Sequence, residues 1–70
     1  MTISYRLLQT AGYTRIERGG QIYTEDQLHE DIWLLNMEIR AGLPKRERIE
    51  AHHQIAQYEA MLDALRRAGA

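Results

Sequence analysis

The sequence predicts an α+β domain in which a short N-terminal β-hairpin packs on an antiparallel two-helix hairpin. Three observations carry this prediction. Two adjacent glycines are flanked by β-branched and aromatic residues, a helix-start signal begins at Thr24, and apolar residues recur every three or four positions through the second half of the chain. We also expect two copies to dimerise into a helical bundle.

Composition limits the classes of protein to consider. Seventy residues make one domain, spanning 1–70, near the lower size limit for a single core. The absence of cysteine excludes disulfides and a cysteine zinc site. A net charge of -1 disfavours nucleic acid as the main partner. No apolar run reaches the roughly 20 residues of a membrane span, and no signal peptide is evident. We therefore expect a cytoplasmic protein that does not interact with membranes.

Residues 1–24 form the N-terminal strand and hairpin region. Residues 3–8 are predicted to be a strand or one helical turn, ended by a break over residues 9–12, and the sequence leaves the conformation of residues 1–12 open. The hairpin follows, with β-forming residues at 13–17 and 21–24 on either side of Arg18-Gly19-Gly20.

Two registers of this hairpin are possible. A three-residue loop pairs Glu17 with Gln21 and places Ile16 opposite Ile22, whereas a two-residue glycine turn places Ile16 beside Tyr23. We favour the three-residue loop, because it puts both isoleucines on the buried face. An isolated hairpin is marginal in water, so it is expected to lie on the helices.

The first helix is predicted over residues 25–41. Thr24 and Gln27 form a capping-box pattern, and Tyr23 and Leu28 occupy the positions of a hydrophobic staple. Gly42 is the expected C-cap.

The second helix is predicted over residues 44–67, opening with Pro44. The short loop between the helices requires them to pack antiparallel. Apolar residues at helical spacing define two facing seams: Leu28, Ile32, Leu35 and Ile39 on the first helix, and Ala51, Ile55, Tyr58, Leu62 and Leu65 on the second.

The faces opposite these seams are also apolar. They carry Trp33, Leu34, Met37 and Ala41 on the first helix, and Ile49, Ala56, Ala60 and Ala64 on the second. A small domain gains stability from oligomerisation, so we predict a homodimer interface that includes Leu34, Ala56, Ala60 and Ala64. In the alternative interpretation, the hairpin and the N-terminus cover these faces, and the alanines are simply good helix formers.

Candidate catalytic and metal residues give no complete motif. His29-Glu30 begins a zinc-protease pattern, but Trp33 stands where the second histidine is required. The spacing of Glu50 and His53 matches one Glu-x-x-His pair of a di-iron site, which needs two such pairs and two further carboxylates, and both residues lie away from the seam. The sequence therefore predicts no catalytic, metal or cofactor-binding residues and a protein that is not an enzyme. His52 and His53 are expected at the surface.

The predicted partner-binding residues are Trp33, Met37 and Arg40, together with Arg15 and Arg18 at the hairpin. Tryptophan, methionine and arginine are enriched at protein interfaces. Burial of Trp33 under the hairpin explains the same residue equally well. Lys45, Arg46 and Arg48 form a second basic cluster, from which a dimeric DNA-binding regulator is a further alternative.

The segment from Tyr13 to Ile32, YTRIERGGQIYTEDQLHEDI, resembles the hairpin-into-helix segment of small bacteriophage head-to-tail joining proteins, the W-like family. The likeness covers under half of the chain and rests on the glycine turn, the helix cap and the periodicity. The chain departs from that pattern because it lacks a clear N-terminal helix and adds a complete second helix. It also resembles small phage-encoded inhibitors of host proteins, by size, lack of cysteine and expected dimerisation.

From these features we predict a non-enzymatic, phage-encoded interaction protein of the host cytoplasm, which inhibits or adapts a host protein as a homodimer. A virion component that joins head to tail is the alternative that the resemblance implies.

Overall fold

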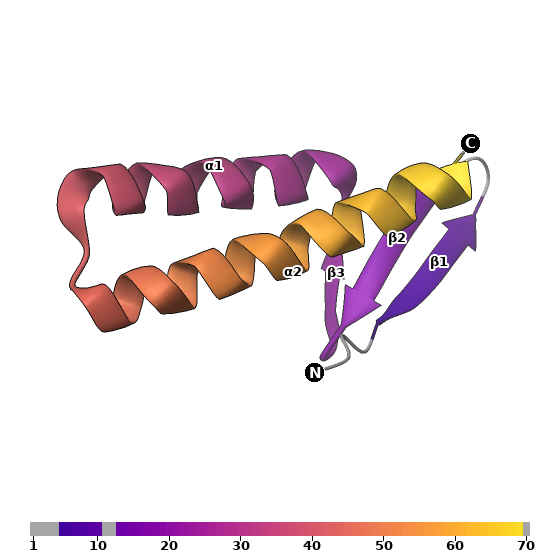
Figure 1. The fold of residues 1–70 in the computed structure, drawn as a ribbon. Helices are drawn as coiled ribbons and strands as arrows, with labels where there is room; N and C mark the ends of the chain where they lie inside the picture. The colour runs from indigo at the N-terminus through magenta and orange to yellow at the C-terminus, as the bar shows by residue number, and fades with distance from the viewer. Residues whose placement is uncertain (1–4, 11–12, 70) are drawn as a thin grey trace.

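The computed structural model describes residues 5–10 and 13–69. Three antiparallel strands are followed by two long helices (Figure 1). The elements are β1 (Arg6–Thr10), β2 (Tyr13–Arg18), β3 (Gln21–Tyr23), α1 (Glu25–Gly42) and α2 (Lys45–Gly69). The predicted α+β architecture, a β-hairpin with an antiparallel helical hairpin, is therefore confirmed.

The hairpin between β2 and β3 has the register that the sequence analysis did not favour. Ile16 pairs with Tyr23 and Glu17 with Ile22, so the turn contains only two residues. Gly19 and Gly20 both have positive φ angles, 60° and 81°, as a tight two-residue hairpin turn requires. The three-residue loop was wrong because Tyr23, rather than Ile22, is buried beside Ile16.

The first strand is longer at its C-terminal end than predicted. Residues 9 and 10 were expected to break the chain, but they continue β1 and pair with Thr14 and Tyr13. Gln9 also contacts the end of α2, where its side-chain amide donates to the Ala68 carbonyl at 3.4 Å. Of the predicted N-terminal segment, residues 3 and 4 lie outside the described residues, as do positions 11 and 12 of the predicted break.

The predicted helix boundaries are confirmed to within two residues. The backbone N–H of Gln27 donates to Thr24 Oγ1 at 3.2 Å, so Thr24 caps α1 as expected. Gly42 has a φ of 101° and ends α1, with Leu43 as the capping residue. The Arg48 N–H donates to the Pro44 carbonyl at 2.9 Å and starts α2. The helices then lie side by side and antiparallel (Figure 1).

The core lies where the sheet meets the C-terminal half of α2 and the start of α1. Ile16 and Tyr23 face the helices from the sheet, and the Tyr23 ring lies 5.9 Å from that of Tyr58, centroid to centroid. The buried cluster consists of Ile16, Tyr23, Leu28, Met61, Leu62 and Leu65, with Ile32, Tyr58 and Ala64 packed against it. The sheet therefore covers one end of the helical hairpin.

The rest of the helical hairpin, residues 33–56, extends away from this core and gives the molecule a length of 43 Å (Figure 1). We call this part the arm. Its interior is the predicted seam, in which Ala51 and Ile55 are buried and Leu35 and Ile39 are half-buried. Among the described residues, neither helix is long and apolar enough to cross a membrane.

Candidate protein-binding surfaces

The arm carries most of the exposed large apolar side chains of the described chain. Trp33 is 59% exposed, and Leu34, Met37 and Ile49 are 45 to 48% exposed. Trp33 and Met37 are one helical turn apart and share a face of α1. Burial of Trp33 under the hairpin, one of the two sequence interpretations, is wrong because the sheet packs on α2 instead.

The structure brings together only part of the predicted partner-binding set. Arg40 is exposed on α1, one turn beyond Met37. Arg15 and Arg18 lie on the sheet rather than on the arm, and the alternation of a strand places them on opposite faces of β2. Trp33, Met37 and Arg40 therefore form one surface, and the two hairpin arginines are separate from it.

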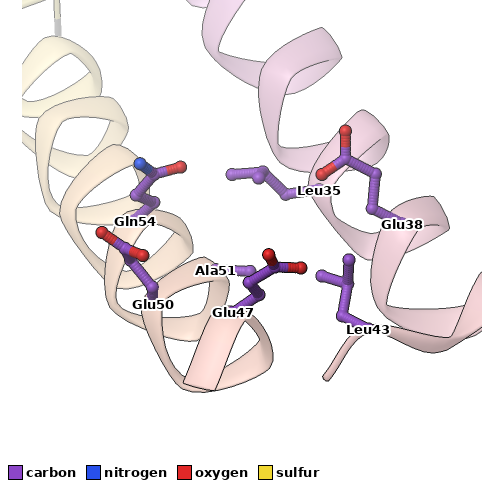
Figure 2. Close-up of a pocket in the computed structure, with 7 residues that line it drawn as sticks. All are labelled: Leu35, Glu38, Leu43, Glu47, Glu50, Ala51 and Gln54. Atoms are coloured by element: carbon purple, nitrogen blue, oxygen red, sulfur yellow. The ribbon is translucent and has the colours of Figure 1, made fainter. Parts of the chain in front are cut away.

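A groove runs along one side of the arm between the two helices. Two adjoining hollows of about 220 and 200 Å³ share Leu35 and Gln54. Figure 2 shows the hollow nearer the tip, with Leu35 and Leu43 directed towards the space between the helices and the Glu47 carboxylate beside Ala51. We call this feature the arm groove. Its residues are Asp31, Leu34, Leu35, Glu38, Leu43, Glu47, Glu50, Ala51, Gln54 and Tyr58.

The arm groove is negatively charged. Every charged residue that lines the tip hollow is a glutamate: Glu38, Glu47 and Glu50. None of the three belongs to an ion pair among the described residues, whereas Glu17, Glu25 and Asp63 each do. A cation entering this hollow would therefore meet carboxylates that are not already neutralised by a neighbour.

The sheet end of the arm groove has a different electrostatic environment. Burial raises the pKa of the Tyr58 hydroxyl, and the nearby Tyr23 and Asp31 act in the same direction. The positive charge of Arg18 opposes them by lowering this pKa. Arg18 and Asp31 therefore act on the pKa of Tyr58 in opposite directions.

A separate hollow outside the arm, of about 400 Å³, lies between β1 and the C-terminal half of α2. Leu7 in β1 and Tyr5 just before it line the hollow and stay partly exposed, because the small side chains of Ala60 and Ala64 leave space opposite them. We call it the β1 hollow. Its lining residues are Tyr5, Leu7, Ala60, Asp63, Ala64, Arg67 and Ala68.

The predicted dimer residues are divided between these two places. Ala60 and Ala64 line the β1 hollow, and Leu34 lines the arm groove. Ala56 is exposed on α2 and lines neither. A single interface that combines Leu34 with the alanines therefore does not follow from their positions.

The histidines lie at the surface. His29 Nε2 accepts from Arg66 Nη2 at 3.2 Å and is 3.6 Å from a Glu25 carboxylate oxygen, which links the start of α1 to the end of α2. His52 and His53 are exposed on α2. Within the described part of the chain, no three His, Asp or Glu side chains are grouped so that they could hold a metal ion.

Sequence reasoning missed the arm groove, although a signal was present. Glu47, Glu50 and Gln54 recur three and four residues apart on α2, on one side of the seam residue Ala51. Glu38 occupies the matching side of α1. Glutamates on the same side of two facing seams predict an acidic groove along that side. The apolar seams alone do not predict this groove.

Comparison with known proteins identifies no relative of this chain. No family profile, curated protein or solved structure matches the chain. The resemblance to head-to-tail joining proteins therefore stays a prediction from the hairpin and the helix cap.

Proposed function

We propose that this chain is a non-enzymatic protein–protein interaction module that forms a homodimer through the β1 hollow and presents its arm to a partner protein. The partner is a host protein that the module inhibits or adapts, as a phage-encoded protein would. The single observation that supports the module most is the exposure of Trp33, Leu34 and Met37 on the part of α1 that lies beyond the core with the sheet.

Energetic reasoning supports a binding role for this surface. Exposed apolar side chains contribute little to the stability of the isolated chain, and their burial against a partner is favourable by roughly 25 cal/mol for each Å² removed from water. Trp33 is also of the residue type most enriched among interface positions that dominate affinity. Contiguous apolar surface of this kind marks interaction sites on small domains.

The β1 hollow supports self-association for a separate reason. β1 is an edge strand that pairs with β2 alone among the described strands, and its Leu7 faces an incompletely filled space. The charged residues of the hollow are Asp63 and Arg67, one turn apart, which form an ion pair of 2.9 Å within α2. Opposite charges so spaced are self-complementary across a two-fold axis, because each can face its counterpart in the second copy.

Partner binding is tested by comparing two exposed apolar residues of different surfaces. The tagged chain is used to capture proteins from its native cell, and the captured protein is identified, purified and titrated by calorimetry. Trp33→Ala is expected to weaken binding at least about tenfold, as for a residue that dominates an interface. Ile22→Ala, on the sheet face away from the helices, is the matched control and is expected to leave affinity unchanged. Equal affinities for wild type and Trp33→Ala would reject the Trp33 surface of the arm as the binding surface.

Self-association is tested by light scattering on chains of 8.2 kDa. Leu7→Lys places a charge in the β1 hollow and is expected to convert the dimer into a monomer. Ile22→Lys adds the same charge on the opposite sheet face and is expected to leave the dimer intact. A wild-type monomer at high micromolar concentration, or a dimer that survives Leu7→Lys, would contradict this part of the proposal.

A further inference from the structure

We propose that the arm groove binds a basic amphipathic helix of the partner protein. Aliphatic side chains of that helix lie against Leu35 and Leu43, and its lysine or arginine side chains meet Glu38, Glu47 and Glu50. This inference rests on the proposed function, since it gives the chemistry of the partner that the arm receives.

The shape of the groove fits a helix. It is bounded on both sides by helices that run antiparallel, so a third helix can lie along it and place its side chains between theirs. The groove extends along α2 from Glu47 to Tyr58, which is roughly 16 Å at about 1.5 Å per residue. That length accommodates about three turns of a bound helix, enough for apolar side chains at two or three successive turns to reach the floor.

The lining of the groove specifies an amphipathic occupant. Leu35, Leu43 and Ala51 provide an apolar floor, with Glu38 on the α1 side and Glu47 and Glu50 on the α2 side (Figure 2). An entirely apolar helix would leave these carboxylates desolvated without a partner, which is costly. A helix with an apolar stripe between two basic flanks can pack its apolar side chains on the floor and pair its basic side chains with the carboxylates.

Charge selects a basic partner rather than an acidic one. The whole chain has a net charge of only -1, yet the tip hollow has three carboxylates and no cation in its lining. The acidity is therefore local to the groove and does not follow from an acidic protein. Complementary potential of this kind increases the association rate and rejects acidic competitors.

A second copy of the chain is a poorer occupant. Its own basic cluster, Lys45, Arg46 and Arg48, lies at the start of α2. A copy that used this cluster to fill the groove of a neighbour would leave its own groove open to the next copy. Such head-to-tail contacts either form a ring or continue as an open chain. A helix from another protein fills the groove without further assembly.

The experiment uses the full chain and a defined probe. The probe is a fluorescein-labelled synthetic helix of about four turns, in which leucines repeat every three or four residues and lysines flank them. A second peptide has glutamate in place of each lysine. Fluorescence anisotropy at increasing salt gives the affinity of each. The lysine peptide is expected to bind, more weakly as salt rises, and the glutamate peptide is not.

Two triple variants locate the binding site. The groove variant is Glu38→Gln, Glu47→Gln and Glu50→Gln, and the control variant is Asp26→Asn, Glu30→Gln and Glu59→Gln. Both remove three exposed carboxylates that have no ion-pair partner among the described residues, and both remove one acid from the first turn of a helix. Their net charges are therefore equal. The groove variant is expected to weaken lysine-peptide binding at least about tenfold, and the control variant about twofold or less.

The outcomes separate this inference from the proposed function. Equal weakening by the two triple variants, or no binding of the lysine peptide, would overturn the groove assignment. A wild-type chain whose molar mass rises with concentration, and a groove variant whose molar mass does not, would also overturn it. That result would assign the groove to a second copy of the chain. With the captured partner protein, loss of binding in Trp33→Ala but not in the groove variant would reject the groove alone. Retained binding in Trp33→Ala would reject the Trp33 surface, on which the proposed function rests.

Discussion

The two ends of the helical hairpin use the same kinds of residue for different purposes. At the sheet end, Met61 is completely buried between α2 and the sheet, whereas on the arm Met37 is 45% exposed. Both methionines lie on long helices outside the predicted seams, and only Met61 packs with the buried residues of the sheet. The comparison indicates that folding energy is concentrated at one end of the molecule, which leaves the other end available for binding.

The physical origin of this difference is the number of layers. At the sheet end, side chains from α1, α2 and β2 converge, so a residue such as Met61 contacts neighbours on all sides. Along the arm, only two helices are present, and two helices can bury only the seam between them. Apolar residues away from the seam, including Trp33 and Met37, necessarily face outwards.

The largest expected effect comes from the two methionines. Met61→Ala is expected to lower the free energy of unfolding by about 2–4 kcal/mol, since it leaves a cavity in the core. Met37→Ala is expected to cost less than about 1 kcal/mol, because its side chain is largely in contact with water. Urea unfolding followed by circular dichroism measures both. Similar losses for the two variants would contradict the division between a folding end and a binding end.

The cap of α1 is expected to have the next largest effect. Thr24→Ala removes the oxygen that accepts from the Gln27 N–H and is expected to lower the free energy of unfolding by about 1 kcal/mol. Thr24→Ser keeps the hydroxyl and is expected to remain within about 0.5 kcal/mol of wild type. Thermal unfolding of the three proteins measures the difference. If serine were as harmful as alanine, packing of the threonine methyl rather than the cap would account for the loss.

The phenol of Tyr58 gives the folded state a dependence on alkaline pH. Its pKa is raised in the folded protein, mainly by burial, so the native state favours the neutral hydroxyl. The associated stability is fully present below the unfolded pKa of about 10 and is lost as pH rises through the folded pKa. The free energy of unfolding should therefore fall less steeply above about pH 10 in Tyr58→Phe than in wild type. Parallel pH profiles would mean that another group is responsible.

The smallest expected effect belongs to the polar contacts that link the start of α1 to the end of α2. Arg66 is exposed and interacts with both Glu25 and His29, at 3.5 and 3.2 Å. Exposed ion pairs contribute little, so Arg66→Ala is expected to change the free energy of unfolding by less than about 1 kcal/mol. Chemical denaturation at low and high salt checks this. A loss as large as that of Met61→Ala would show that polar contacts, and not the apolar core, hold this end together.

Sequence patterns predicted the helical part of the fold well. The capping pattern of Thr24 and Gln27 predicted the start of α1 correctly, and every predicted seam residue is buried or half-buried. These signals are local in the chain, and helical periodicity identifies the face that is buried. The hairpin was less predictable, because either of Ile22 and Tyr23 could fill the buried position, and the choice is made by the aromatic ring of Tyr58, 35 residues away from Tyr23.

The remaining errors concern where the sheet lies. Met61 was not assigned to the core, because the seam was defined only by the contact between the two helices. Trp33 could not be assigned to core or surface for the same reason: a sheet over α1 would bury it, and a sheet over α2 leaves it exposed. Which helix supports a hairpin depends on packing between distant segments, and local patterns do not report it.

Accessibility of Trp33 tests the central claim most directly. It is the only tryptophan, so quenching of intrinsic fluorescence by acrylamide reports on this one side chain. We predict strong quenching at every protein concentration, in monomer and dimer alike, because the arm stays open when the β1 hollow is filled. Addition of the partner protein should protect the fluorescence. A tryptophan that is already shielded in the isolated chain, or becomes shielded as the chain self-associates, would contradict an arm kept open for another protein.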